Sequence, residues 1–408
     1  MADFILQDIL AEILIRLPLH SLLRFKCVQK SWYHLIRSPY FIDLHFNHQE
    51  NKNKYLFFQG RFHGDFFFHV DDKQCNEYNP GLRFPIPKFL ETGFVFKIHG
   101  TCRGLICFSA ENRINSGLNI VYLWNPATRM YRSLPCSPGT FSDDQYHRSF
   151  TLGYFPKITD YKVIKFQSYD YTVGEDFRAP SVCIYSLSTD SWKTVGEDII
   201  GQLSSYRKLY NSVIVNGVAY WVGIREPLLQ VIVCFDTETE KIREIILPPQ
   251  YGLDLSMGQI SSFNLVQHFD EVLLSVVNMN TFARSLILDI FSLGKGDGED
   301  VVYTQKVSID LAKVSLWPIG FRYSGEIVLF DYDNTRGGFL SYDPEKKIAT
   351  KILDDSWELW SYAHLRVPEE DDEFVVFEGE EEYIQLMYVN SFAENLVSLG
   401  DKQRKVVN

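Results

Sequence analysis

One pattern occurs five times after about residue 90, and this repeat constrains the fold more than any other feature of the chain. In each copy, alternating apolar residues lead through a polar turn into a second strand-like run. Alternation is the spacing of a strand with one buried face, and turn residues such as Asn-Pro or Asp-Pro-Glu bend the backbone. Each copy therefore predicts a β-hairpin. The copies are IVYLWNPATRMYRSLP (120–135), VCIYSLSTDSWKTV (182–195), VIVCFDTETEKIREIILP (231–248), LILDIFSLGKGDGEDVVYTQKV (286–307) and GFLSYDPEKKIATKIL (338–353).

The spacing of the hairpins predicts how they are organised. The aromatic markers Trp124, Tyr185, Phe235, Phe291 and Tyr342 are 61, 50, 56 and 51 residues apart. Further strand-like runs lie between them: GLICFS (104–109), YKVIKFQS (161–168), NSVIVNGVAYWVG (211–223), DEVLLSVV (270–277) and GEIVLFDYD (325–333). Four strands about every 50 residues are typical of propeller blades. The sequence thus predicts an all-β, kelch-like propeller of five or six blades.

The N-terminal segment 4–46 has helical spacing instead. A first apolar stripe ends at Leu17 because Pro18 cannot continue a helix. Ser21 is predicted to be the N-cap of a second helix, and a last short turn is expected around Phe41 and Leu44 after Ser38-Pro39. The segment is therefore predicted to be a small three-helix unit, which makes the whole chain α+β.

About 46 residues cannot bury so many apolar side chains alone, since a domain that small encloses only ~60% of its unfolded surface. Exposed Leu and Ile side chains would form a patch that needs a partner. Between Ile13 and Ile42 there are five Lys or Arg residues and no acidic residue, which suits an acidic partner surface. Alternatively, the helices pack on the rest of the chain as a cap.

The N-terminal segment resembles an F-box. The resemblance is carried by Asp8, Ile9, Leu10, Glu12, Ile13, Leu14, Arg16, Leu17, Pro18, Ser21, Leu22, Leu23, Arg24, Phe25, Val28, Lys30, Ser31, Trp32, Leu35, Ile36 and Phe41. It implies docking on a Skp-type adaptor and, through that adaptor, on cullin and RING subunits. The implied adaptor contacts are Ile5, Leu6, Ile9, Ile13, Leu14, Leu17, Pro18, Leu22, Leu23, Val28 and Trp32. Ile5-Leu6 replaces the usual Leu-Pro, so a lower adaptor affinity is expected.

The rest of the chain resembles the plant F-box-associated domain, of the F-box/kelch-repeat or S-locus F-box type. This resemblance is carried by HGTCRGLIC (99–107), LWNPATRMYRSLP (123–135) and the runs DYKVIK, YSLSTDSWK, NGVAYW and FDTETEKIREIILP. It implies a substrate-recognition subunit of a Skp–cullin–F-box ubiquitin ligase, in which the propeller selects the protein to be ubiquitinated, with a link to plant self-incompatibility. A propeller that binds a ligand or acts as a scaffold, without a ligase role, is the alternative. The expected domains are 1–46 (F-box), 47–90 (linker and first strands), 91–395 (propeller) and 396–408 (tail).

Target binding is expected in the blade loops that vary in length. These loops are 136–150, 168–180, 196–210 and 249–262, and their candidate anchors are Tyr146, Tyr169, Tyr171, Tyr206 and Tyr251. Tyrosine offers a large contact area at little cost in rotamer entropy. Scattered surface aromatics are the simpler interpretation.

The net charge of −12 is concentrated in one stretch, because residues 369–382 hold nine acidic residues and no basic one. Two solvated acidic loops around a strand at 374–377 are the simpler interpretation, and a contact for a basic target protein is the alternative. Nucleic acid is disfavoured by the same sign of charge.

Catalysis, cofactors and metals are not expected. The chain lacks a G-x-S-x-G elbow, a phosphate loop and an H-E-x-x-H motif. Carboxylates such as Asp236, Asp331 and Asp333 could meet at a ring centre, but turn capping explains them more simply. His45 and His48 are interpreted as the polar edge of the helical segment.

The chain is expected to be cytoplasmic or nuclear, or both, without a membrane partner. It has no uninterrupted apolar run of ~18 residues and no signal-peptide pattern. Its seven cysteines are scattered without CxxC spacing, which favours reduced thiols.

Overall fold

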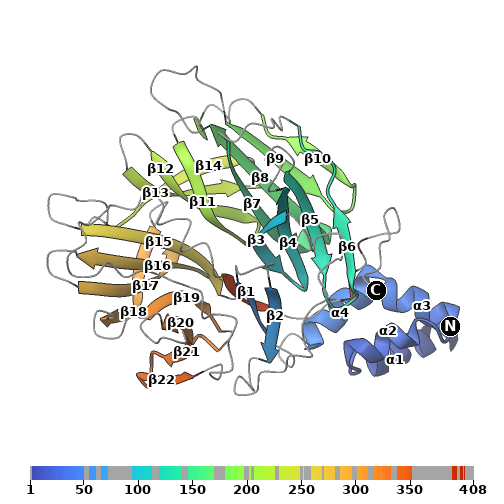
Figure 1. Cartoon of the computed structure of the whole chain (residues 1–408). Helices are drawn as coiled ribbons and strands as arrows, with labels where there is room; N and C mark the ends of the chain where they lie inside the picture. The colour runs from blue at the N-terminus through green and yellow to red at the C-terminus, as the bar shows by residue number, and fades with distance from the viewer. Residues whose placement is uncertain are drawn as a thin grey trace. The chain divides into compact units, whose positions relative to one another are not determined.

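The computed structural model describes residues 2–49, 55–60, 66–71, 94–112, 119–138, 146–169, 180–196, 202–203, 206–225, 229–248, 251, 259–268, 271–280, 285–295, 301–310, 316–322, 324–331, 338–351, 388–392, 396–397 and 399 (Figure 1). The chain forms two compact units. Unit 1 comprises Met1–Tyr55, Pro85–Leu247 and Phe392–Asn408, and unit 2 comprises Leu56–Phe84 and Pro248–Ser391. No helix within these ranges is long and apolar enough to cross a bilayer.

The N-terminal segment forms four helices rather than three: α1 (Ala2–Leu14), α2 (Leu19–Phe25), α3 (Lys30–Arg37) and α4 (Pro39–Gln49). The expected last short turn is the 11-residue helix α4. Ser38-Pro39 ends α3 but also starts α4, because proline is favoured at the first helical position. The Ser38 hydroxyl accepts a hydrogen bond from the Phe41 amide at 3.2 Å, which caps the new helix.

The first helix ends earlier than its apolar stripe predicts. The amide of Leu17 bonds the carbonyl of Leu14 at 3.1 Å, a three-residue spacing that tightens the helix end. Pro18 then occupies the N-cap position of α2, with extended ψ of 147°. Ser21 therefore lies inside the first turn of α2, and its predicted capping role was wrong.

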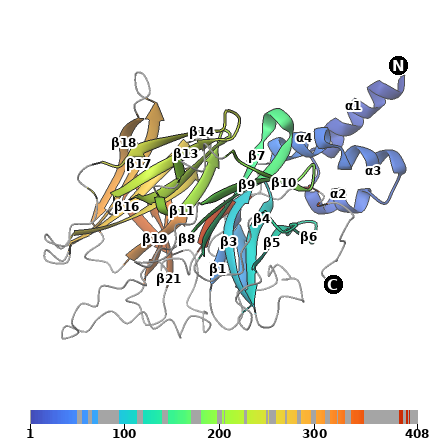
Figure 2. The same ribbon diagram turned by 90° about the horizontal axis from the view of Figure 1, so that it is seen from above.

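The β-region contains five four-stranded antiparallel sheets, each formed by strands that are consecutive in sequence (Figures 1 and 2). In unit 1 they comprise β3 (Phe94–Cys102), β4 (Leu105–Asn112), β5 (Asn119–Asn125), β6 (Met130–Ser133); β7 (Tyr146–Phe155), β8 (Asp160–Tyr169), β9 (Ser181–Ser186), β10 (Ser191–Thr194); and β11 (Tyr206–Val215), β12 (Val218–Arg225), β13 (Leu229–Asp236), β14 (Lys241–Ile246). In unit 2 they comprise β15 (Gln259–His268), β16 (Glu271–Asn280), β17 (Ser285–Lys295), β18 (Val301–Asp310); and β19 (Leu316–Phe321), β20 (Ile327–Asp331), β21 (Gly338–Asp343), β22 (Ile348–Lys351). All five predicted hairpins are confirmed.

Burial differs systematically between inner and outer strands. The central part of β13 is buried on both faces, whereas every residue of the outer strand β22 is exposed. Runs such as Val231–Phe235 are continuously apolar because both faces of the strand are covered, and this matches the runs that the sequence presents.

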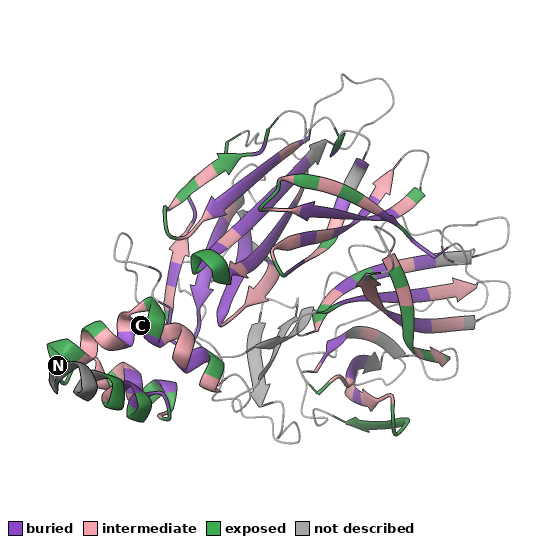
Figure 3. Cartoon of the chain, turned by 180° about the vertical axis from the view of Figure 1, so that it is seen from behind, coloured by how far each residue is buried: buried purple, intermediate pink, exposed green. Residues whose placement is uncertain are grey.

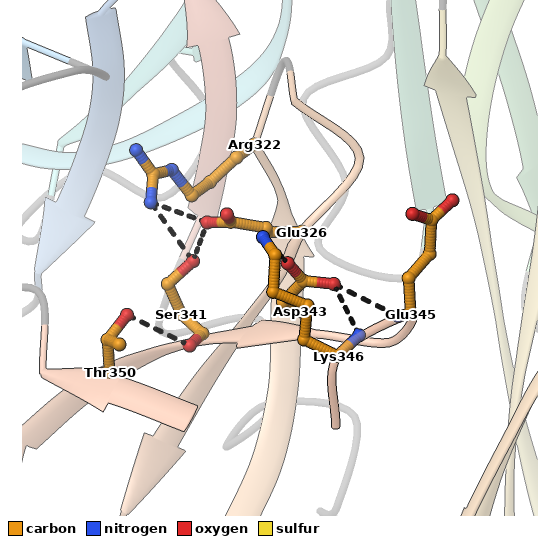
Figure 4. A network of polar contacts seen from close by, with 7 residues as sticks. All are labelled: Arg322, Glu326, Ser341, Asp343, Glu345, Lys346 and Thr350. Carbon is orange, nitrogen blue, oxygen red and sulfur yellow. Dashed lines mark hydrogen bonds and ion pairs between the residues drawn. The ribbon is translucent and has the colours of Figure 1, made fainter. Parts of the chain in front are cut away.

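The polar turns act as predicted, and Figure 4 shows one of them. Asp343 accepts hydrogen bonds from the amides of Glu345 and Lys346, both at 3.0 Å, and so fixes the Asp-Pro-Glu turn between β21 and β22. Across the neighbouring hairpin, an Arg322 Nη atom lies 2.6 Å from a Glu326 carboxylate oxygen. Local side-chain chemistry therefore sets these bends.

A sixth sheet has three strands in the order β2 (Phe66–Asp71), β1 (Tyr55–Gly60) and β23 (Tyr388–Phe392). Strands from the two ends of the β-region are thus neighbours. This pairing closes an edge that each strand would otherwise leave open.

Gly153 in β7 supplies a test of how tightly neighbouring sheets pack. A Cβ atom at this position would lie 2.7–2.9 Å from side-chain atoms of Ile214 in β11. Gly153→Ala is therefore expected to lower the free energy of unfolding by about 1–3 kcal/mol. Gly196→Ala is the matched control, because nothing lies within 4 Å of its added Cβ. Urea unfolding of both variants checks this, and equal stability of the two would contradict the close packing.

Candidate functional site

The four N-terminal helices share one small apolar core with Ala127 of the β5–β6 turn and with Leu396. It includes Leu14 (1% exposed), Leu22 (0%), Ile36 (0%) and Phe41 (0%). Leu14 and Leu22 were expected to contact an adaptor, but they face this core and are not available for direct contact. Leu17, Leu23 and Trp32 are half-buried against the same core, and Pro18 is exposed. For Ile5 and Leu6 the structure describes the backbone in α1 only.

Several large apolar side chains of this module are exposed, and Figure 3 colours parts of the N-terminal helices green for exposed residues. Ile9 is 53% exposed, Ile13 56%, Val28 64% and Tyr40 66%. They are four of the nine exposed large apolar residues found among the described side chains, although the helices form a small part of the chain. Ile9 and Ile13 are four residues apart and so lie on one face of α1. Three of the predicted adaptor contacts, Ile9, Ile13 and Val28, are therefore exposed apolar side chains.

The same module carries a positive field. Burial and the nearby Arg37 lower the pKa of Lys26 to about 8. This value is still above neutral pH, so the lysine remains mostly protonated there. Arg37 in turn stacks on the ring of Tyr33 at 4.9 Å. Asp43 is the one acidic residue between positions 13 and 49 in the sequence, and its carboxylate lies 3.1 Å from Arg103. The helices therefore offer a basic, partly apolar surface.

His45 is a buried residue rather than the polar edge that the sequence suggested. It is 2% exposed, stacks on Phe41, and its ring Nε2 lies 3.1 Å from the carbonyl oxygen of Leu17. A turn carbonyl with no helical partner explains why a histidine is placed there. No group of three metal-ligating side chains occurs in the described ranges.

His45 predicts a pH dependence of the helical module. Burial lowers its pKa from the ordinary 6.5, and the hydrogen bond to Leu17 only partly opposes this. The unfolded chain therefore binds a proton that the folded chain does not, so stability is complete above about pH 6.5 and is lost as the pH falls below it. Thermal unfolding at about pH 7.5 and about pH 5.5 measures this effect. His45→Gln should show a smaller pH difference, and an identical one would contradict the prediction.

The predicted target-binding tyrosines divide into four groups. Tyr206 is 6% exposed in the core of unit 1 and its hydroxyl donates to Glu244, so its predicted exposure was wrong. Tyr251 is half-buried, and its hydroxyl lies 2.7 Å from an Asp289 oxygen. Tyr146 and Tyr169 are paired across β7 and β8, and only their backbones are described. Tyr171 lies outside the described residues, as does the acidic stretch 369–382.

Of the carboxylates considered for catalysis, the structure describes the side chain of Asp236 alone. Asp236 accepts hydrogen bonds from the amides of Glu238 (2.8 Å) and Thr239 (3.1 Å), which is turn capping. The side chain of Asp331 and all of Asp333 lie outside the description.

The two ends of the first two sheets of unit 1 differ in the length of the connections between strands. Tight turns at 103–104, 126–129 and 156–159 lie at the end that contacts the helices, through Arg103, Ala127 and Tyr154. The longer connections 113–118 and 170–179 leave from the opposite end, where Tyr146 pairs with Tyr169. β7 has ten residues, so the two ends are about 30 Å apart.

Sequence reasoning missed Arg103, Asp43 and Tyr154, which join the helices to the first two sheets. The available signal was an arginine beside Gly104 at a tight turn, where Asn is the usual residue. Asp43 was also visible as a lone acid in a basic segment.

An N-terminal helical module with an exposed apolar and basic surface, followed by consecutive four-stranded antiparallel sheets, defines a protein of the propeller class with an added helical module. The chain belongs to the F-box associated beta propeller domain family, which its residues 86–392 match, and residues 7–44 match the F-box domain. The predicted family and fold class are thereby confirmed. Architectures of this kind are typically non-catalytic.

Relatives come from Arabidopsis thaliana. An F-box protein is 28% identical over 263 residues, covering 60% of this chain and 62% of the relative. An F-box/kelch-repeat protein is 26% identical over 252 residues, covering 58% of this chain and 64% of the relative. The chain thus spans somewhat less than two thirds of these relatives.

Solved structures with a similar arrangement are distant. The β-propeller domain of the trilobed protease from Pyrococcus furiosus is 15% identical with a TM-score of 0.36, covering 63% of this chain and 71% of that one. The six-bladed β-propeller lectin of Aleuria aurantia is 8% identical with a TM-score of 0.39, covering 72% and 88%. At these values the likeness extends to neither residues nor function.

Proposed function

We propose that this protein is the substrate receptor of a Skp–cullin–F-box ubiquitin ligase. Its F-box docks on a Skp-type adaptor and reaches the cullin and RING subunits through it, while the β-region binds the target protein. The protein itself performs no chemistry and needs no cofactor. The observation that carries the proposal is the exposure of Ile9, Ile13 and Val28 in the segment that matches the F-box domain.

The charge of the helices supports the same partner. Coulomb steering by the five basic residues between Ile13 and Ile42 favours an acidic adaptor surface and raises its association rate. The single acid Asp43 is engaged by Arg103, so it offers little repulsion to such a partner. Apolar side chains then supply affinity once the partner is in place.

Target binding is proposed at the end of the unit 1 sheets away from the F-box. The tight turns at the near end contact the helices, whereas the longer connections leave from the far end next to Tyr146 and Tyr169. Loops held on a rigid sheet are common positions for binding residues. A basic target would fit the acidic stretch 369–382. The narrower assignment to plant self-incompatibility rests on the S-locus resemblance alone, and a cytoplasmic or nuclear location belongs to the same proposal.

Co-purification tests this function. The full chain and a Skp-type adaptor, expressed together, should elute as one complex, and adding cullin and RING subunits should give ubiquitin transfer. A chain that is folded by circular dichroism yet elutes without the adaptor would contradict the ligase role. That result would favour a ligand-binding or scaffold propeller.

A further inference from the structure

Helix α4 contacts the first sheet of unit 1 through Arg103, in the turn between β3 and β4. The Arg103 guanidinium lies 3.1 Å from an Asp43 oxygen and donates to the Asn47 side chain at 3.1 Å. It also stacks over the Phe46 ring at 4.4 Å. Asp43, Phe46 and Asn47 follow at three- and four-residue spacing, so a single side chain contacts one whole face of α4.

The second sheet completes the contact from its other side. The Tyr154 hydroxyl in β7 bonds both Asp43 oxygens, at 2.9 and 2.8 Å, and its ring lies 4.1 Å from the Arg103 guanidinium carbon. Burial and the bond to Asp43 raise the pKa of Tyr154 to about 12, which keeps the hydroxyl protonated as a donor. Arg103, Asp43 and Tyr154 are called the Arg103 clamp below.

Arg103 occupies a backbone position that its residue type disfavours. Its φ is +42° and that of Gly104 is +80°, as in the two-residue hairpin turn that prefers Asn-Gly. The same turn in the β11–β12 hairpin is made by Asn216 (φ +51°) and Gly217 (φ +81°). The turn itself therefore does not require arginine, whereas the contacts with α4 do.

Residues near the C-terminal end of the sequence pack where the helices meet the first two sheets. Leu396 (1% exposed) packs in the F-box core, while Val397 (8%) and Leu399 (1%) pack with the first two sheets. The buried side chain of Asn125 donates to the Val397 carbonyl at 2.9 Å. These three residues, called the C-terminal strap, were expected to belong to a tail, yet they bridge the helices and the sheets.

We infer that Arg103 is a positioning residue: with the C-terminal strap, its clamp holds the F-box in one orientation on the first two sheets. The inference rests on the proposed function in one respect, because a fixed orientation would present a bound target to the ligase at a constant place. A guanidinium placed between two rings and a carboxylate has few alternative arrangements.

Arg103→Asn is the decisive variant, because asparagine suits the positive φ of the turn and removes the clamp. Arg129→Asn is the matched control: Arg129 also has positive φ (+55°), in the β5–β6 turn, and is exposed. Cys27 and Cys136 are exposed and free, on the F-box and on the first sheet region respectively, and can carry paired spin labels once Cys75 and Cys102 are replaced by alanine.

The wild-type chain and Arg129→Asn should give one narrow distance distribution, and Arg103→Asn a broad one. Hydrogen exchange of α4 amides should become about tenfold faster in Arg103→Asn alone. Arg103→Lys should be intermediate, since it keeps the charge but loses the planar face. A narrow, unchanged distribution in Arg103→Asn would overturn the inference.

Two further measurements keep the result unambiguous. If Arg103→Asn does not fold, Tyr154→Phe removes only the hydroxyl that bonds Asp43, and an unchanged distribution there would also overturn the inference. Adaptor affinity is measured separately and should differ less than about twofold between Arg103→Asn and wild type. A narrow wild-type distribution without any adaptor binding would leave the clamp standing and remove the ligase role.

Discussion

Replacing Ile9 and Ile13 together with aspartate is expected to weaken binding of a Skp-type adaptor at least about 100-fold while the protein stays folded. Each side chain is more than half exposed, at 53% and 56%, so a polar replacement costs the free chain little. Burial of an isoleucine against a partner contributes about 1.5–3 kcal/mol, and two of them correspond to two or more factors of ten. Placing carboxylates in the dry centre of an interface weakens the complex further.

Calorimetric titration of the adaptor into the full-length variant measures the loss. Ile348→Asp is the matched control, because Ile348 is also 53% exposed but lies on β22 of unit 2. It should bind the adaptor as the wild type does. Unchanged affinity in the Ile9/Ile13 variant would remove α1 from the docking surface.

Leu22→Asp is expected to abolish adaptor binding for a different reason, because it unfolds the helical module. Leu22 is 0% exposed and lies among Leu14, Ile36 and Phe41. Truncation of such a leucine to alanine already costs about 2–5 kcal/mol, and an unpaired buried carboxylate costs more. A module of this size has little stability to lose.

Hydrogen exchange separates this effect from loss of the surface. In Leu22→Asp the amides of α2 to α4 should lose protection while those of β11 to β14 keep it. In the Ile9/Ile13 variant both sets should stay protected. Retained helix protection in Leu22→Asp would contradict the assignment of Leu22 to the core.

The hairpins were predictable because their information is local. Alternation and a turn such as Asp343-Pro-Glu specify strand, bend and strand within about 15 residues, and the turn carboxylate bonds amides two and three positions away. No local signal of this kind fixes a long-range partner, such as the pairing of β1 with β23.

Helix boundaries and the burial of individual side chains were harder to predict from the sequence. The pair Ser38-Pro39 is compatible both with the end of one helix and with the start of the next. The structure shows that a new helix, α4, starts at Pro39. The stripe containing Ile9, Ile13 and Leu14 was apolar over a wide arc, so spacing alone could not separate the exposed residues from the buried Leu14. One apolar side of this helix packs in the helical core, and the other is exposed.

The Arg103 clamp could not have been derived from spacing. Arg103 and Asp43 are 60 residues apart, and Tyr154 is a further 51 residues along the chain. Each reads as an ordinary polar or aromatic residue of its own element. Only the packing of α4 against two sheets brings them into contact.

The participation of Leu396 in the F-box core and of β23 in the sheet with β1 has a consequence for synthesis. A polypeptide leaves the ribosome N-terminus first, so the helices emerge hundreds of residues before their final contact is available. During that interval the nascent chain lacks Leu396 and one neighbour of β1. The helical module therefore reaches its final packing only after residue 396 has been synthesised.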